Sequence, residues 1–460
     1  MITANEWYEI PETERHSRLW DKITDYKATE TYRRAFVAQE YFMGRNYDVL
    51  TFRKPITGEK GKLLEEKFPV MNRIFYRLVL QMSQYSLTNG ITINKGEQDD
   101  IKDKLGKRFD TRLLRMGEVA IIQGACYAFW NNGEIVYFTP LEFIPLYDEW
   151  SGEMVAGIRF WQTADDRPMY VQIFEKTGIT DVELSESGVV KNTKQQSYSN
   201  VNKDQMKRGR KLPEMLRKVI GGGELATLPI RGLYANPERE SQFTADMRAN
   251  VFRYDRIATD FGSNLDMAND IYWVINNFGG SVADVKRMLK EISELKATYA
   301  DGDGATAVPH TMEVPHEARR IALEILNSLI IANFCGIDIL KVEGGARTAT
   351  EIKLSTIDLN NLATRFESEV YSFVQELVEL AIGIEVEDIS FKRNFIVNEE
   401  MVANMLMALA TNGSVDERTL LEKHPLIDAD SVDTILERMA LELFDDDEDD
   451  DEPDDGAQEE

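Results

Sequence analysis

Three stretches of the chain carry hydrophobic residues at helical spacing. Between about 238 and 268, an apolar residue recurs every three or four positions, which places one apolar stripe along one side of a helix. The stripe consists of Phe243, Met247, Val251, Tyr254, Ala258, Phe261 and Leu265. The same spacing predicts helices over about 316–333 and about 351–382. Stripes this wide on long helices are best buried by neighbouring copies of the chain, so we expect an assembly.

The hydrophobic period changes from helical to two over residues 125–176. "ACYAFWNNGEIVYFTP" places Asn-Gly between two alternating runs, which is the pattern of a β-hairpin. A second strand–turn–strand pattern, "TPLEFIPLYDEWSGEMVAGIRF", follows at 139–160. We therefore predict one antiparallel sheet over 125–176. Residues 1–95 are predicted to be mostly helical, with another short helix at 110–124.

The remaining segments separate or follow the long helices. Residues 269–315 show the pattern of strand, helix and strand, and a Gly-rich link follows at 334–350. Residues from about 185 to 224 are polar and end in glycines, which favours a mobile insertion whose basic residues either contact nucleic acid or are merely solvated. A small helical block is expected over 397–444.

The charge of the chain limits the kinds of partner that it suits. The net charge is −27, and the last 16 residues, 445–460, contain 12 acidic residues and no base, which predicts a disordered tail. This tail either repels DNA, recruits basic scaffold segments, or only keeps the subunit soluble. The rest of the chain has 68 acidic and 53 basic residues, so the composition does not indicate the basic face of a protein that wraps DNA.

Several kinds of site and segment are not supported by the sequence. Two cysteines, Cys126 and Cys335, rule out a disulfide framework and fit a reducing compartment. No signal-peptide pattern and no run of about 18 apolar residues is present, so we expect no membrane span. Four histidines are too far apart in sequence to indicate a metal site: His16, His310, His316 and His424.

Short motifs for phosphate or metal binding are incomplete. "GEKGK" at 58–62 and "GGGE" at 221–224 lack the Lys-Ser/Thr pair of a phosphate-binding loop. "DGDG" at 301–304 resembles the start of a calcium loop but lacks its closing Glu, and a turn explains it better. We therefore predict no catalytic residues, no metal and no cofactor.

Taken in order along the chain, several stretches resemble the tailed-bacteriophage portal (head–tail connector) proteins. "EYFMGRNYDVL" and "NRIFYRLVLQMSQYSLTNGITI" resemble the early part of that family, and the two hairpins resemble its wing. "LPIRGLYANPERESQF" resembles the approach to the first stem helix, and "GGARTATEIK" the junction near the narrowest point of the channel. "ISFKRNFIVNEEMVANMLMALATNGSVDERTLLEKHP" resembles the closing strand and crown. No single stretch is diagnostic, but the ordered set covers nearly the whole chain.

This resemblance implies an α+β, mainly helical portal-type subunit with an α/β wing, long stem helices, a small α/β clip and a helical crown. The implied parts are a wing at 1–237 with a mobile insertion at about 185–224, stem helices at 238–268 and 316–333, a clip at 269–315, a tunnel loop at 334–350, a wing or spine helix and strand at 351–396, a crown at 397–444, and the disordered acidic tail at 445–460.

A portal-type function follows from the same resemblance. It implies a homo-oligomeric ring of twelve subunits that is not an enzyme and forms a channel at one capsid vertex, through which double-stranded DNA is packaged and ejected. The implied partners are the terminase large subunit, a head–tail adaptor, and the major capsid and scaffold proteins, with no membrane. The ring would form in the host cytoplasm and reside in the virion. The alternatives are a metal-dependent nucleic-acid enzyme that uses "DGDG", and a minor head or adaptor protein.

The tunnel loop supplies the first set of candidate contact residues. Lys341 and Arg347 either contact the DNA backbone or are solvated, with Gly344 and Gly345 supplying hinge freedom. A mostly acidic wall would repel and centre a duplex, whereas many basic contacts would arrest it.

The first stem helix supplies the second set. On the face opposite the apolar stripe, Arg248, Arg253 and Arg256 alternate with Asp255 and Asp260. These residues form either salt bridges between subunits or an ordinary solvated helix face.

Overall fold

In the computed structural model the chain forms two compact units, residues 1–393 and 394–460. The described residues are 3–55, 63–65, 69–94, 98–131, 134–185, 188–196, 198, 228–268, 272–276, 306–310, 316–338, 356–394, 416–423, 432 and 434–438.

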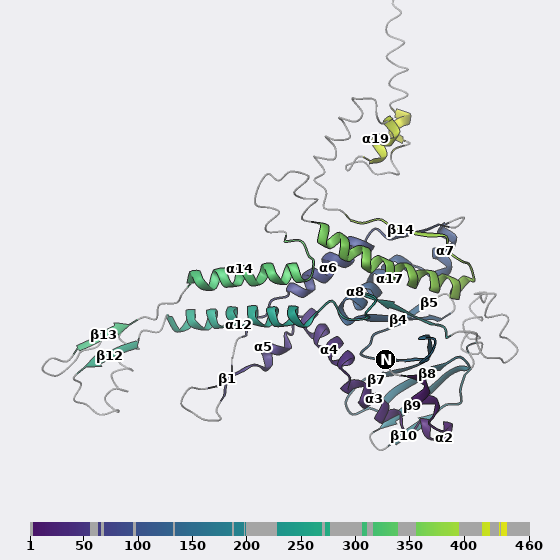
Figure 1. Ribbon diagram of the computed structural model, residues 1–460, viewed down its shortest axis with the longest axis horizontal. Coiled ribbons are helices and arrows are strands. Elements are labelled where there is room, and N and C mark those ends of the chain that lie inside the picture. Colours follow the sequence, from purple (N-terminus) through teal and green to yellow (C-terminus); the bar gives the residue numbers. More distant parts are fainter. Residues whose placement is uncertain are drawn as a thin grey trace, which may run out of the picture. The chain divides into compact units, whose positions relative to one another are not determined.

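Two long helices, α12 (Ala245–Ala268) and α14 (His316–Asn333), lie side by side (Figure 1). Between them in sequence, strands β12 (Tyr272–Asn276) and β13 (Thr306–His310) pair antiparallel. This confirms both helices and both strands of the predicted helix–strand–strand–helix order. The helix predicted between the two strands lies outside the described residues.

The first long helix is shorter than predicted, because it begins at Ala245 and not near 238. The preceding residues form a turn in which Asn236 exchanges side-chain hydrogen bonds with the backbone of Glu240 at 2.9 and 3.0 Å. Arg239 has a left-handed backbone with φ 59°, which a helix does not accommodate. The chain therefore enters α12 only after this turn.

The β structure forms two larger sheets, so the single sheet predicted over 125–176 is wrong. One has the order β11-β4-β5 and the other the order β10-β9-β8-β7-β6. The chain breaks between them at 139–142, where the Glu142 N–H bonds the Thr139 carbonyl in a turn at Pro140. The strands are β4 (Ala125–Asn131), β5 (Glu134–Phe138), β6 (Phe143–Tyr147), β7 (Met154–Trp161), β8 (Met169–Glu175), β9 (Gly178–Ser185), β10 (Gly188–Asn192) and β11 (Ile230–Tyr234).

Both predicted hairpins are present within these sheets. Asn131 is opposite Glu134 in the β4–β5 hairpin, and Leu146 is opposite Ala156 in the β6–β7 hairpin. Strand β9 was not predicted, and β10 falls inside the segment predicted to be a mobile insertion. Val189 and Val190 carry the strand propensity of β10, but the surrounding polar residues obscured it.

The amino-terminal part of the first unit is mostly helical, as predicted. Its helices end where glycine permits a positive φ: 75° at Gly44, 70° at Gly90 and 91° at Gly124. The helices are α1 (Ala4–Tyr8), α2 (Glu12–Arg15), α3 (Leu19–Ala28), α4 (Glu30–Phe42), α5 (Tyr47–Thr51), α6 (Ile74–Leu87), α7 (Gln98–Leu105) and α8 (Phe109–Gln123). The short strands are β1 (Arg53–Pro55), which pairs with β2 (Leu63–Glu65), and β3 (Ile91–Asn94), which pairs with β14 (Asp388–Phe391).

The third long helix, α17 (Ile357–Ile382), is the centre of the largest hydrophobic core. Phe366, Val370 and Phe373 are each at most 1% exposed, and α6, α7, β4 and β11 pack against the helix. We predicted that sister chains would bury this stripe, and that prediction is wrong because the subunit buries it itself. The carboxyl end of the helix is Gly383, with φ 74°.

The second unit contains the helix α19 (Glu417–Lys423) and a helical stretch at 434–438. Asp416 caps α19, since its carboxylate accepts the Thr419 N–H at 3.3 Å. Apart from Asp416 and Val432, the other residues of the predicted crown lie outside the described residues, as does the acidic tail at 445–460. Taken together, the described elements confirm a mixed α+β fold that is about half helical. Within the described stretches, no helix has the length and apolar character that a bilayer crossing requires.

We expect Gly124→Ala to destabilise the first unit far more than Gly152→Ala. Both glycines have a positive φ, but a Cβ at Gly124 would lie 2.8 Å from the Arg239 carbonyl oxygen, whereas nothing lies within 4 Å at Gly152. Backbone strain alone costs about 1 kcal/mol at Gly152, and strain plus clash costs about 3 kcal/mol or more at Gly124. Urea denaturation followed by circular dichroism measures the difference, and equal midpoints would contradict the close packing at Gly124.

Candidate assembly interface

The helices α12 and α14 run antiparallel and are joined by polar contacts at both ends. Near the start of α12, Asp246 accepts a hydrogen bond from Asn333 Nδ2 at 2.7 Å. Near its end, the Asp260 carbonyl accepts one from Arg319 Nη1 at 3.2 Å. The Phe261 ring meets the His316 ring edge-on at 5.8 Å. The register of the pair is therefore fixed from end to end.

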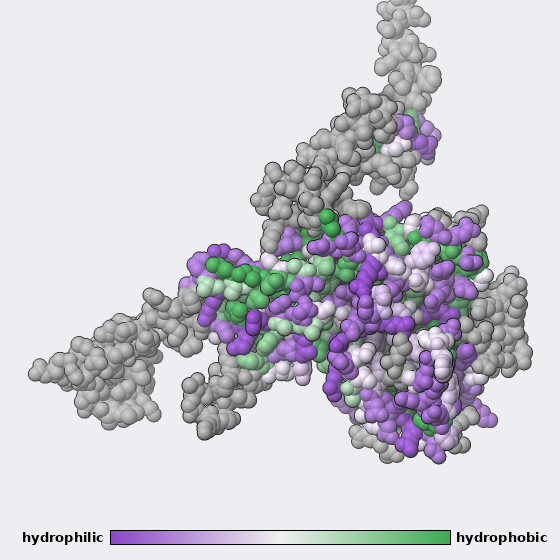
Figure 2. Space-filling model, in the orientation of Figure 1, coloured by the Kyte–Doolittle hydropathy of each residue, from purple (hydrophilic) through white to green (hydrophobic). Residues whose placement is uncertain are grey.

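Only part of the apolar face of α14 is buried in the subunit. Leu326 and Ile330 are buried, whereas Ile321, Ile325 and Leu329 are 47%, 56% and 44% exposed. These three residues, which we call the α14 stripe, follow one another at steps of four and so lie along one side of the helix. Figure 2 shows a hydrophobic surface where Figure 1 places α14. An exposed row of large aliphatic side chains on a long helix is typical of a surface that another helix or subunit covers.

The opposite side of α12 is fixed to the body of the subunit by a buried carboxylate. Asp255 is 0% exposed. One of its oxygens accepts the Asn72 N–H at 3.0 Å, and the other accepts Asn46 Nδ2. One turn later, Thr259 Oγ1 donates to the Asp255 carbonyl at 2.7 Å and accepts the Val70 N–H at 2.9 Å. Burial raises the pKa of Asp255 to about 6, although the hydrogen bonds from Asn46 and Asn72 oppose this rise.

An ion pair reinforces the same side of α12. Arg248 donates through Nε and Nη2 to the two oxygens of Asp48 on α5, each at 2.6 Å, and Tyr41 donates to Asp48 at 2.8 Å. Burial raises the pKa of Asp48, but the hydrogen bonds from Arg248 and Tyr41 outweigh it and leave that pKa below its usual value. Arg248, a candidate for a salt bridge between subunits, is thus already paired within its own chain.

The other predicted site residues are in different settings. Arg253 is exposed, and the Arg256 guanidinium lies 4.7 Å from the centre of the Phe52 ring. Asp260 is half-buried. Placing Asp255 on a solvated face was wrong, because it is fully buried. The tunnel-loop candidates lie outside the described residues: Lys341, Gly344, Gly345 and Arg347.

Sequence reasoning missed the residues that anchor α12. Asn46, Asp48 and Asn72 lie in segments whose pattern indicated only helices and turns. A signal was present on α12 itself, because Arg248, Phe252, Asp255 and Thr259 recur at steps of 4, 3 and 4, like the apolar stripe. These positions contain charged and polar residues, so the spacing was interpreted as a solvated face when it marks a second packed face.

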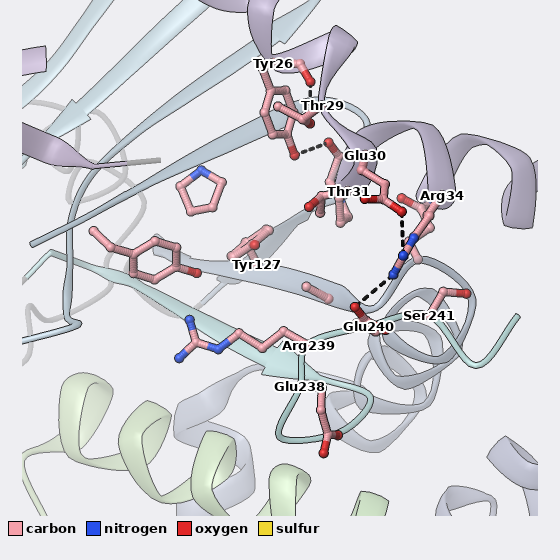
Figure 3. A pocket seen from close by; sticks show the side chains of 15 residues that line it. Tyr26, Thr29, Glu30, Thr31, Arg34, Tyr127, Glu238, Arg239, Glu240 and Ser241 are labelled. Carbon is pink, nitrogen blue, oxygen red and sulfur yellow. Dashed lines mark hydrogen bonds and ion pairs between the residues drawn. The ribbon is translucent and has the colours of Figure 1, made fainter. Parts of the chain in front are cut away.

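A cavity of about 400 Å³ lies between α4, strands β4 and β6, and the turn before α12 (Figure 3). Arg239 points along it, with its guanidinium 5.2 Å from the Tyr147 ring and 4.4 Å from the Tyr234 ring. Among the described residues, neither Arg239 Nη1 nor Gln123 Oε1 has a hydrogen-bond partner. A polar cavity of this size suits ordered water. No catalytic set of residues lines it, and sequence analysis did not identify it.

Metal ligation has no support in the described part of the chain. The described residues contain no group of three or more His, Cys, Asp or Glu side chains that could hold an ion. The "DGDG" stretch lies outside them. Both cysteines are free, with Cys126 buried and Cys335 half-buried.

Because the pKa of Asp255 is raised to about 6, we expect its contribution to stability to fall as pH rises. The folded state binds this proton more tightly than the unfolded state, whose Asp pKa is about 3.9. The melting temperature of the wild type minus that of Asp255→Asn should therefore decrease between about pH 4 and 6, and then become constant. The change corresponds to roughly 2–3 kcal/mol at most.

The matched control for this pH series is Asp166→Asn, which removes a carboxylate from an exposed turn. Its difference from the wild type should stay flat over the same pH range. A flat difference for Asp255→Asn as well would contradict the buried-carboxylate anchor. Melting curves by differential scanning calorimetry at several pH values give both differences.

Comparison with known sequences supports the family resemblance. Residues 21–449 match a family model described as phage portal protein, SPP1 Gp6-like. A portal protein of Clostridium phage phiCD119 is 25% identical over 185 residues, which cover 38% of this chain and 40% of that relative. The aligned part thus spans less than half the length of the relative.

Two solved structures of gene transfer agent particles also match, each at 11% sequence identity. One is the virion of a native particle, with a TM-score of 0.40 over 75% of this chain and 86% of the other. The second is the neck of a native particle computed with C12 symmetry, with a TM-score of 0.43 over 77% and 90%. The family model covers far more than half of the sequence. The chain therefore belongs to the SPP1 Gp6-like phage portal protein family, whose members are structural proteins and not enzymes.

Proposed function

We propose that this chain is the subunit of a ring of twelve copies that forms a channel for double-stranded DNA at one vertex of a phage capsid. The ring assembles in the host cytoplasm and remains in the virion. It docks the terminase large subunit during packaging and a head–tail adaptor afterwards, and it contacts the major capsid and scaffold proteins. Family membership supports this proposal at the level of the whole chain.

The roles of the segments follow from the same proposal. α12 and α14 are the stem, and the β12–β13 region belongs to the clip that meets the motor and adaptor. The sheets and amino-terminal helices form the wing, and α17 braces it. The second unit is the crown, and the link at 334–350 is the tunnel loop.

The observation that carries this proposal is the exposed α14 stripe. Fully burying an aliphatic side chain contributes about 1.5–3 kcal/mol. Ile321, Ile325 and Leu329 are about half exposed, so covering all three contributes roughly 2–4 kcal/mol at each contact. In a closed ring every subunit makes this contact on one side and receives it on the other, so no stripe remains in water.

The charge of the chain suits a channel through which DNA moves better than a protein that binds DNA tightly. Double-stranded DNA carries one negative charge per about 1.7 Å of its axis, and each neutralised phosphate strengthens binding. On α12, Arg253 and Arg256 are exposed and Asp260 beside them is half-buried, so the charges there are mixed. A mixed or acidic wall lets the duplex move, and Lys341 and Arg347 in the tunnel loop supply the few basic contacts.

Two other functions fit the sequence less well. A minor head or adaptor protein would not need the order of long helix, paired strands and long helix. A metal-dependent nucleic-acid enzyme rested on "DGDG" and neighbouring acidic residues, and membership of a structural family argues against it.

We expect Ile325→Glu to abolish the ring, because it places a charge in the middle of the α14 stripe. Native mass spectrometry and negative-stain images of the purified protein should show twelve-fold rings for the wild type and monomers for the variant. Val190→Glu is the matched control, since Val190 is 59% exposed on β10, and it should assemble like the wild type. A wild-type protein that is monomeric at micromolar concentration would overturn the proposed function.

We expect Lys341→Ala with Arg347→Ala to alter DNA transport without altering assembly. Removing two basic side chains per subunit removes the phosphate contacts of the loop, so DNA should be retained less well and packaged at a different rate. The control, Arg167→Ala with Lys191→Ala, removes the same charge from exposed positions near the five-stranded sheet. Unchanged packaging rate and retention in a defined in vitro packaging reaction would show that the two loop residues are merely solvated.

A further inference from the structure

A second exposed apolar surface lies on the segments that contact α12 through Arg248, Asp255 and Thr259. It consists of Met43, Tyr47, Leu50, Val70 and Met71, which are 37–52% exposed, and we call it the root patch. Its residues come from two segments, 43–50 and 70–71, that are joined where Asn46 Nδ2 donates to the Asn72 carbonyl at 3.2 Å. The subunit therefore has two groups of exposed large hydrophobic residues along the stem, the α14 stripe and the root patch.

These two surfaces lie on opposite sides of α12. Residues 246, 260 and 261 contact α14. The other side contacts α5 and its neighbouring segments through Arg248, Phe252, Asp255, Arg256 and Thr259. At 3.6 residues per turn the mean directions of these two sets of positions lie about 140° apart around the helix. Figure 1 agrees, because α14 and α5 lie on either side of α12.

The two surfaces also lie at the same height along α12. The α14 stripe lies between the contacts of Asn333 with Asp246 and of Arg319 with Asp260, so it runs beside residues 247–259. The root patch is fixed to the same stretch through Asp255 and Thr259. Copies related by a rotation about an axis parallel to α12 would therefore bring stripe and patch together without an axial shift, as closure into a ring requires.

Charge at the edges of the two surfaces is complementary. Beside the stripe, Glu317, Arg320 and Glu324 give two acidic groups and one basic group, all well exposed. Beside the root patch, Arg45 pairs with Glu40, and Arg73 is exposed, which gives two basic groups and one acidic group. A stripe facing its own copy would bring like charges together and leave the root patch in water.

From these observations we propose that the α14 stripe of one subunit packs on the root patch of the next, in a head-to-tail contact around the ring. The partner is a second copy of this chain, and the receiving surface is built from α5 and the segment that precedes α6. This inference rests on the proposed ring and adds which surfaces meet in it. The contact is heterologous, so each subunit uses two different surfaces.

Cross-linking between introduced cysteines tests this contact. The probe is the variant Met71→Cys/Ile325→Cys, treated with a short bis-maleimide while assembled and then run on a denaturing gel. We expect a ladder of covalent oligomers, because each subunit is linked to the next on both sides. The wild type controls for the native cysteines, and each single variant should remain at the wild-type level. The pair Val190→Cys/Ile325→Cys, with one cysteine on β10, should give rings without a ladder.

The outcomes separate the inference from the proposed function. Covalent dimers from Ile325→Cys alone would show that stripe meets stripe, which overturns the head-to-tail contact. Rings by native mass spectrometry without a ladder from the paired variant would also overturn it, while leaving the proposed ring intact. Absence of rings in the wild type would overturn the ring and the contact together.

If the double cysteine variant does not form rings, a pair of opposite charges introduced across the contact tests it instead. Met71→Lys, combined with Ile325→Glu, should restore most of the rings that Ile325→Glu loses, because the two charges then face each other across the contact. Val190→Lys in the same Ile325→Glu background should restore none. Failure of Met71→Lys to restore rings would overturn the contact.

Discussion

The buried carboxylate of Asp255 determines how the long helices are attached to the rest of the subunit. A carboxylate without solvent is costly unless hydrogen bonds satisfy it, and here Asn46 and the Asn72 backbone supply them. One turn later, Thr259 adds hydrogen bonds to the Asp255 carbonyl and from the Val70 N–H on the same side of α12. Because polar bonds have stricter geometry than apolar contacts, they fix the rotation and height of α12. The position of α14, and of its exposed stripe, follows from that anchor.

Much of the fold was predictable because local signals were strong. The periodic apolar residues of α12, α14 and α17 predicted these helices, and Gly44, Gly90 and Gly124 marked helix ends. Tertiary pairing was not predictable in the same way. The break between the two sheets depends on how β11 pairs with β4, about 100 residues away in sequence, and no local pattern indicates such a partner.

The candidate site was predictable only in part, and for a physical reason. An amphipathic pattern shows that a helix has an apolar face, but it does not say what covers that face. The apolar stripe of α17 is covered from within the subunit, whereas only part of the apolar face of α14 is covered and the α14 stripe is exposed. Asp255 and Arg248 look like surface charges in sequence, because burial of a charge depends on partners elsewhere in the chain, here Asn46 and Asp48. The hydrophobic patterns predicted individual helices and strands, and the expected arrangement into wing, stem, clip and crown came from the family resemblance.

In the proposed ring, the burial of α17 bears on the order of folding and assembly. Since this helix completes its core without help from another chain, the body of the subunit can fold on leaving the ribosome. The helix α14 is different, because its only buried residues, Leu326 and Ile330, lie in its carboxyl-terminal half, and its amino-terminal half has none. Contacts with α12 hold α14 at both ends, and in the proposed ring a neighbouring subunit adds the apolar burial that α14 lacks. In the proposed ring, this helix would therefore complete its apolar packing only when the last subunit is added.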